Sequence, residues 1–158
     1  ELFYALTDPM GEQLTDILDK IRNKMETLPK EKQLNGMGDI YYPNIPNIVD
    51  ILISDRNAVK LIVDCAKGTK YEGFLDNIAM RNAESIRIAA ENVEGKTVNS
   101  IEGQTMEVLM DGYIRTLFRL ILSNKKRETI IQCMEMIGKI YEKGIMALME
   151  EDVEDELR

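Results

Sequence analysis

The sequence contains no histidine and no tryptophan, and only two cysteines, three phenylalanines and four prolines among its 158 residues. Without histidine the chain lacks the commonest general base and metal ligand, and Cys–His or Ser–His nucleophilic catalysis is impossible. Neither a glycine-rich phosphate loop nor the ligand spacing of a calcium loop is present. We therefore expect no enzyme, no metal site and no cofactor. A catalytic pair of carboxylates stays open as an alternative, although no particular pair is favoured.

Long apolar runs are absent as well. No stretch approaches the roughly 18 to 20 residues that cross a bilayer, and the N-terminus lacks the basic and then apolar pattern of a secretory signal. Cys65 and Cys133 form no CxxC pair, and each lies among apolar neighbours in a segment with helical periodicity. We interpret both as buried thiols in a reducing compartment. The sequence thus predicts a soluble, cytoplasmic protein without a membrane partner.

Basic residues are the minority among the charged ones. The 20 Lys and Arg against 28 Asp and Glu give a formal net charge of −8 at pH 7. Because Lys and Arg contacts to phosphate supply most non-specific affinity for DNA, we expect this chain by itself not to bind DNA. The length suits one domain, which we place at residues 1–149, followed by an acidic tail at residues 150–158.

Helical periodicity dominates the sequence, and no segment shows a sustained alternation of apolar and polar residues. The pattern therefore predicts an all-α bundle of about six or seven helices. The expected helices lie at residues 1–6, 9–28, 46–54, 56–67, 71–93, 100–122 and 126–149. The boundary between the first two helices is expected at Asp8 and Pro9. The 56–67 helix is expected to begin with Asp55 as its N-terminal cap and to stop at Gly68. The one long irregular connection is expected between Pro29 and Pro46.

The last two predicted helices have unusually wide apolar faces. Their apolar positions cover about half of the helix circumference, more than an outer helix needs for one core contact. Both helices could be central within the monomer. We favour a second copy of the same helix pair, which would form an isologous four-helix interface of a homodimer. The residues that we expect at this interface are Leu117, Ile121, Ile130, Met134, Ile137 and Tyr141.

Two polar residues, Asn82 and Ser85, fall in the middle of the apolar face of the 71–93 helix. Buried polar groups need partners. They either bond to neighbouring groups, with Asn82 and Tyr113 satisfying each other or the backbone in a filled core, or they orient a guest in an apolar cavity. For the cavity, the expected ligand-binding residues are Phe74, Ile78, Asn82, Met106, Met110 and Tyr113. Residues 35–46 are expected to form its movable rim.

Several segments resemble transcription regulators of the tetracycline-repressor family. Residues 1–6 (ELFYAL) are similar to the start of the helix that follows the family's DNA-binding headpiece. Residues 51–56 (ILISDR) and 64–75 (DCAKGTKYEGFL) resemble its middle region, and residues 112–122 and 130–145 resemble its two C-terminal dimerisation helices. The chain also opens inside a helical pattern without an initiator Met. The resemblance implies a sensor and dimerisation domain whose headpiece precedes it.

By this resemblance, a small hydrophobic or amphiphilic effector binds within the bundle, changes the separation of the two headpieces and releases the operator. DNA would be a partner only through the missing headpiece. Two other functions remain open, namely a structural or adaptor bundle without a ligand and a small all-α enzyme. A closed core without a void would favour the adaptor, whereas a metal or a pair of carboxylates in a cleft would favour the enzyme.

Overall fold

The computed structural model describes residues 1–95 and 97–150 of the chain, and every regular element in these ranges is helical. The prediction of an all-α fold is therefore confirmed. In chain order the elements are α1 (Leu2–Glu26), a 3₁₀ turn (Lys30–Lys32), α2 (Met37–Tyr41), a second 3₁₀ turn (Tyr42–Asn44), α3 (Ile45–Ser54), α4 (Arg56–Cys65), α5 (Phe74–Glu94), α6 (Ser100–Leu122) and α7 (Arg127–Glu150). Beyond Glu150, the expected acidic tail lies outside the described residues.

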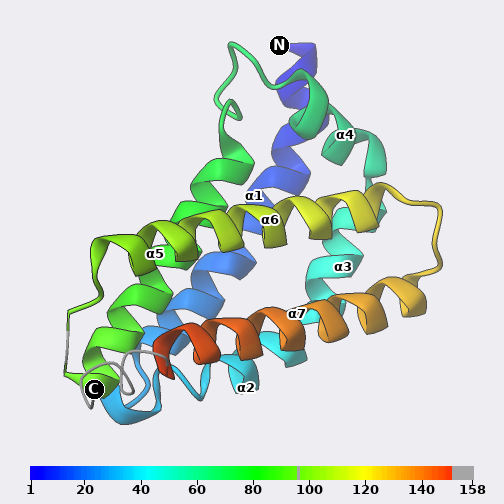
Figure 1. The fold of residues 1–158 in the computed structure, drawn as a ribbon. Helices are drawn as coiled ribbons and strands as arrows, with labels where there is room; N and C mark the ends of the chain where they lie inside the picture. The colour runs from blue at the N-terminus through cyan, green and yellow to red at the C-terminus, as the bar shows by residue number, and fades with distance from the viewer. Residues whose placement is uncertain (96, 151–158) are drawn as a thin grey trace.

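The helices form two layers. α6 and α7 run antiparallel along one face, joined by a short connection, while α1 and α5 cross behind α6 (Figure 1). α5 makes the most extensive contact with α6, and α3 packs against both α1 and α7. The core between the layers contains fully buried aliphatic side chains such as Leu14, Val49, Val59, Ile121 and Ile130. Each of these contributes about 1.5–3 kcal/mol relative to an exposed position.

α1 continues without a break through Pro9, where the sequence predicts a boundary between two helices. The prediction is wrong because packing outweighs the local signal. Pro9 lacks the N–H that would bond one turn back, which ordinarily costs about 3 kcal/mol in a helix interior. Met10 and Leu14 bury the next turn in the core. Asp8, the expected cap, instead accepts a hydrogen bond from the Tyr71 hydroxyl at 3.0 Å.

The expected irregular connection between Pro29 and Pro46 is largely helical. It contains α2 and two 3₁₀ turns. Its prolines are compatible with this. Pro29 lies in the position before the first 3₁₀ turn, and Pro43 and Pro46 are each the second residue of their element, where the backbone N–H has no partner inside the helix. Leu34 and Ile45 are buried and attach the segment to the core. The segment thus closes one end of the bundle as a packed element.

α4 begins where the local sequence predicts a boundary, whereas α5 begins at Phe74, three residues after the expected start at Tyr71. The Asp55 side chain accepts a hydrogen bond from the Ala58 backbone N–H at 2.9 Å, so the predicted cap is confirmed. Between the two helices, Gly68 and Gly73 have φ angles of 76° and 72°, a region that other residues rarely adopt. The chain therefore reverses between α4 and α5 at glycines.

The two cysteines do not share the predicted environment. Cys65 is exposed and Cys133 is half-buried. The expectation of a buried thiol is wrong for Cys65 because it ends α4 at the edge of a buried stripe formed by Ala58, Val59 and Ile62.

Within residues 1–95 and 97–150, no helix combines the length and the apolar character that a membrane crossing requires.

Four of the six residues expected at a dimer interface are buried inside the monomer, namely Leu117, Ile121, Ile130 and Met134. These side chains have no surface to offer a partner, which corrects their assignment. The other two, Ile137 and Tyr141, are half-buried. The physical reason is that the middle of each wide apolar arc faces the chain's own core. One edge of the arc of α7 reaches the surface at Met136 and Ile140, and α6 exposes Ile101 and Val108 on the side opposite its apolar arc.

Candidate functional site

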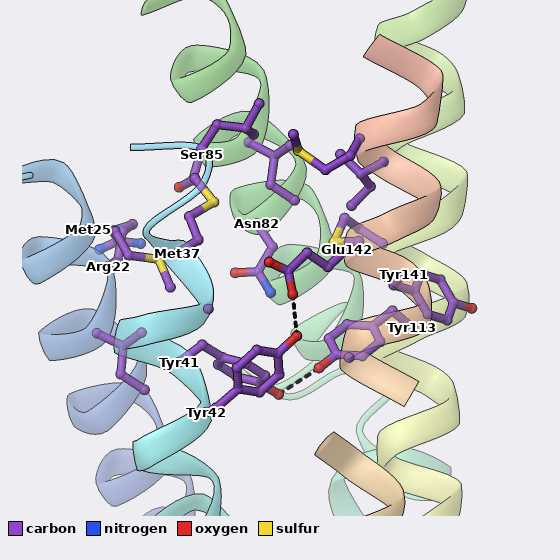
Figure 2. Close-up of a pocket in the computed structure, with 18 of the residues that line it drawn as sticks. Arg22, Met25, Met37, Tyr41, Tyr42, Asn82, Ser85, Tyr113, Tyr141 and Glu142 are labelled. Atoms are coloured by element: carbon purple, nitrogen blue, oxygen red, sulfur yellow. Dashed lines mark hydrogen bonds between the residues drawn. The ribbon is translucent and has the colours of Figure 1, made fainter. Parts of the chain in front are cut away.

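A cavity of about 160 Å³ lies inside the bundle, between α1 and α2 on one side and α5, α6 and α7 on the other (Figure 2). The lining residues come from α1 (Leu18, Ile21, Arg22, Met25), from the segment around α2 (Leu34, Met37, Gly38, Tyr41, Tyr42), from α5 (Asn82, Ser85, Ile86), from α6 (Met110, Tyr113) and from α7 (Gly138, Tyr141, Glu142, Ile145, Met146). A dry, engineered cavity of about 150 Å³ is known to hold benzene. The space is therefore sufficient for a small organic guest.

Half of the expected ligand-binding residues line this cavity. Asn82, Met110 and Tyr113 do so, and four residues of the expected rim, Met37, Gly38, Tyr41 and Tyr42, form one of its walls. The structure thus brings together one turn of α5, one turn of α6 and the α2 segment. These are the elements between which the sequence predicts a pocket.

The other three expected ligand-binding residues lie elsewhere, and the structure corrects their assignment. Phe74 begins α5 and packs its ring against Tyr71, with 5.5 Å between the ring centroids. It precedes Asn82 by eight residues, about 12 Å along the helix axis. Met106 is buried in the core, and Ile78 packs against the core. The cavity lies beside the middle of α5, from Asn82 to Ile86, whereas the sequence places it beside the first turns of the helix as well.

Two walls of the cavity were not expected from the sequence. α1 contributes four residues between Leu18 and Met25, and α7 contributes five between Gly138 and Met146. Most of these positions are apolar residues of ordinary amphipathic helices, so no local signal distinguishes them from core residues. The signal that could have been used is Glu142, a carboxylate one residue from Tyr141 in the wide apolar arc of α7.

A cluster of tyrosines forms one side of the cavity. The ring centroids of Tyr41 and Tyr42 are 5.8 Å apart, those of Tyr41 and Tyr113 are 6.5 Å apart, and those of Tyr113 and Tyr141 are 5.0 Å apart. The Tyr113 hydroxyl donates a hydrogen bond to the Tyr41 hydroxyl at 2.7 Å. The alternative in which Tyr113 and Asn82 satisfy each other is therefore not the observed arrangement.

Burial keeps these phenols neutral. It raises the pKa of Tyr41 to about 12, an effect that the hydrogen bond from Tyr113 partly offsets. Burial also raises the pKa of Tyr113 and, together with the hydrogen bond to the Glu142 carboxylate, the pKa of Tyr42. A neutral phenol at every physiological pH can donate a hydrogen bond and present a polarisable ring face.

Glu142 is the one carboxylate among the cavity-lining residues, and Arg22 is the one basic group. The Tyr42 hydroxyl donates to Oε2 of Glu142 at 2.6 Å, and Figure 2 shows this bond joining the 3₁₀ turn after α2 to α7. Oε1 faces the backbone of Gly38, where a Cβ atom would lie 3.3 Å from it. The absence of a side chain at Gly38 therefore allows α2 to approach the carboxylate.

Asn82 and Ser85 project from α5 into the cavity (Figure 2). Both are half-buried, and within the described part of the chain neither side chain has a hydrogen-bond partner. An amide and a hydroxyl in such a place can accept from or donate to a guest. The cavity thus combines an apolar wall with a few polar groups that are free to orient a small molecule, which is the usual composition of a ligand pocket.

The described residues define an all-α helical domain with a largely apolar cavity that is partly open to solvent. Comparison with known proteins adds no relative, because no family model, no curated protein and no solved structure matches this chain.

Proposed function

We propose that the chain is the effector-sensing and dimer-forming domain of a cytoplasmic transcription regulator of the tetracycline-repressor type. In this proposal a small hydrophobic or amphiphilic molecule occupies the cavity and modulates DNA binding by a headpiece attached to the N-terminal end. The sequence resemblance supplies the class of protein. The observation that carries the proposal is the cavity itself, with its unpartnered Asn82 and Ser85 in an apolar wall.

The cavity favours a sensing domain over the two competing functions. An adaptor bundle would gain stability from a filled core, since a cavity forfeits packing contacts between the side chains that line it. An enzyme that uses a pair of carboxylates would need a second one, whereas Glu142 is the only carboxylate among the lining residues. Binding without chemistry is the activity that this lining supports best.

α1 provides a direct mechanical link between the cavity and the N-terminal end. Its 25 residues span about 37 Å, and its second half lines the cavity. Its first half is attached to the loop before α5. There Asp8 accepts from Tyr71, and the Lys70 ammonium lies 3.0 Å from the Asp8 carboxylate. A guest that displaces α1 would therefore move the point at which a headpiece is attached.

The test is saturable binding of one small apolar molecule per chain, measured by thermal unfolding and by titration with an environment-sensitive neutral naphthylamine dye. At a free concentration of about 100 times Kd, a ligand stabilises the folded state by about 2.7 kcal/mol. For a chain of this size that corresponds to a rise in Tm on the order of 5–10 °C. An adaptor bundle would show neither dye binding nor a shift.

A glycine pair in α7 supplies the matched variants. A Cβ atom at Gly138 would lie 3.0 Å from the Tyr42 ring, whereas one at Gly144 would meet nothing within 4 Å. Gly138→Ala should displace the Tyr42 ring and weaken the dye at least fivefold. Gly144→Ala should leave dye affinity unchanged and stabilise the helix by about 0.5–1 kcal/mol. Equal dye binding by both variants would place the dye outside this cavity and contradict the proposal.

A further inference from the structure

The charge of the cavity lining is unbalanced at Glu142. Its carboxylate accepts one hydrogen bond from the neutral Tyr42 hydroxyl, and within the described residues no Lys or Arg forms an ion pair with it. The side chain is half-buried. A carboxylate that is partly removed from water and has no cationic partner bears a desolvation cost that a bound cation would relieve.

Arg22, the one basic group in the lining, is already paired. Its guanidinium lies 2.8 Å from the Asp19 carboxylate and 3.7 Å from that of Glu26, and Arg81 lies 3.3 Å from the same Asp19. This group of two cations and two anions is balanced in itself. An anionic guest would have to compete with Asp19 and Glu26 for Arg22, whereas a cationic guest at Glu142 would displace no existing ion pair.

The tyrosines next to Glu142 strengthen the preference for a cation. Tyr42 bonds directly to the carboxylate, and the rings of Tyr41, Tyr113 and Tyr141 follow it at centroid separations of 5.0 to 6.5 Å. The faces of aromatic rings carry negative potential and attract quaternary and tertiary ammonium groups, and the Lys139 ammonium already lies 5.9 Å from the centroid of the Tyr42 ring. Burial and the neighbouring Glu142 carboxylate raise the pKa of Tyr42, so its phenol stays neutral and adds no negative charge of its own.

The remaining wall selects the body of the guest. It is mostly aliphatic and includes the flexible side chains of Met25, Met37, Met110 and Met146. Methionine adapts to guests of varied shape and makes favourable contacts with aromatic groups. The formal net charge of −8 on the chain adds a field that concentrates cations near the protein.

Resting on the proposed sensing function, we infer that the cavity recognises a lipophilic monocation. This guest is an amine or quaternary ammonium compound with an aromatic or branched aliphatic body. Its charged group lies between the Glu142 carboxylate and the tyrosine rings, and its body lies against the methionine-rich wall. Asn82 supplies the orienting hydrogen bond where the guest carries a donor or acceptor.

Three probes of one shape and different charge test this inference on the full chain. They are benzyltrimethylammonium, its neutral isostere neopentylbenzene and the anion benzylsulfonate. Affinities are measured by calorimetry or thermal shift at one fixed ionic strength. We expect the cation to bind at least tenfold more tightly than the neutral isostere, and the sulfonate to bind most weakly.

Glu142→Gln is the decisive variant, because the amide oxygen can still accept the Tyr42 hydrogen bond while the charge is removed. The cation should lose at least tenfold in affinity and the neutral isostere should keep its affinity. Glu128→Gln removes an exposed charge from the same helix outside the cavity. This control should bind all three probes as the unaltered chain does.

The outcomes separate the two claims. If the neutral isostere binds as tightly as the cation, or if Glu142→Gln and Glu128→Gln weaken the cation equally, the charge preference is overturned while the sensing function stands. If none of the three probes nor the naphthylamine dye binds the unaltered chain, the sensing function fails and the inference fails with it.

Discussion

Single tyrosine hydroxyls determine much of the local chemistry of this protein. The phenols of three tyrosines, Tyr41, Tyr42 and Tyr113, line the cavity. The Tyr113 hydroxyl donates a hydrogen bond to the Tyr41 hydroxyl, and the Tyr42 hydroxyl donates one to Glu142. A phenol that is buried and bonded in the folded state resists ionisation. The consequence can be measured as a dependence of stability on alkaline pH.

We predict that stability falls between pH 10 and pH 12, and that Tyr41 contributes to the fall. Its pKa is about 12 in the folded state, against about 10 in an unfolded chain. A raised pKa stabilises the fold below the unfolded value, and this contribution is lost as the pH rises through the folded value. Tyr41→Phe should be less stable than the unaltered chain at pH 8, because the Tyr113 hydroxyl loses its acceptor.

The difference in free energy of unfolding between the unaltered chain and Tyr41→Phe should then decrease by on the order of 1–2 kcal/mol between pH 8 and pH 11.5, as measured by urea unfolding. The comparison at pH 8 and pH 9 serves as the control, because Tyr41 is protonated in both states there. A difference that stays constant up to pH 11.5 would show that Tyr41 ionises in the folded protein as readily as in the unfolded chain.

α6 begins with a capping box. The Asn99 side chain accepts from the backbone N–H groups of Ile101 and Glu102, and the Glu102 carboxylate accepts in return from the Asn99 N–H at 2.9 Å. Such a capping box satisfies backbone donors that the first turn leaves unpaired. Because α6 packs on α5 and α7, the stability of this one end affects the whole bundle.

Asn99→Ala should therefore lower the free energy of unfolding by about 1 kcal/mol, within a range of about 0.5–2 kcal/mol for such caps. The matched control is Asn124→Ala in the exposed connection between α6 and α7, which should change stability by less than about 0.5 kcal/mol. Chemical denaturation of both variants measures the difference. Equal effects at the two positions would mean that the cap contributes nothing to the stability of α6.

At the scale of the whole molecule, α6 and α7 each expose two large apolar side chains. These are Ile101 and Val108 on α6 and Met136 and Ile140 on α7, and the two helices lie side by side at one face of the bundle (Figure 1). Groups of exposed apolar side chains on a monomer commonly mark an interaction site. The proposed homodimer would use this face, with the same patch on both copies.

Met136→Glu should convert the dimer to monomers in sedimentation or light scattering, because an unpaired charge buried at an interface costs several kcal/mol. A loss of that size corresponds to at least a hundredfold weaker association. Met80→Glu is the matched control, since Met80 on α5 is 61% exposed and Met136 is 66% exposed. Both variants should fold. A chain that is monomeric without any change, or that dimerises equally with either variant, contradicts the proposed interface.

The boundaries of the later helices could be predicted from the sequence alone. α6 spans the expected residues 100–122, and Asp55 caps α4 as expected. These features depend on local interactions between residues at most four positions apart, and a periodic pattern with clear caps records such interactions directly. Pro9 is the exception. Its local signal is strong, but the burial of the next turn of α1 is a long-range effect that outweighs it.

The candidate site could be predicted only in part, and the reason is geometric. Asn82 is conspicuous because it interrupts an apolar face, a signal contained within α5 itself. Arg22 and Glu142 meet the same cavity only because α1 and α7 cross α5 and α6 at particular angles, which depend on how all the side chains pack.

The apolar residues of α6 and α7 show the same division between what the sequence determines and what the tertiary structure decides. Their periodicity, set by the sequence, determines that each helix has a wide apolar arc. Only the packed tertiary structure decides that Ile121 and Ile130 face the core while Met136 faces outward, because a helix can be rotated about its axis without any change in its sequence pattern.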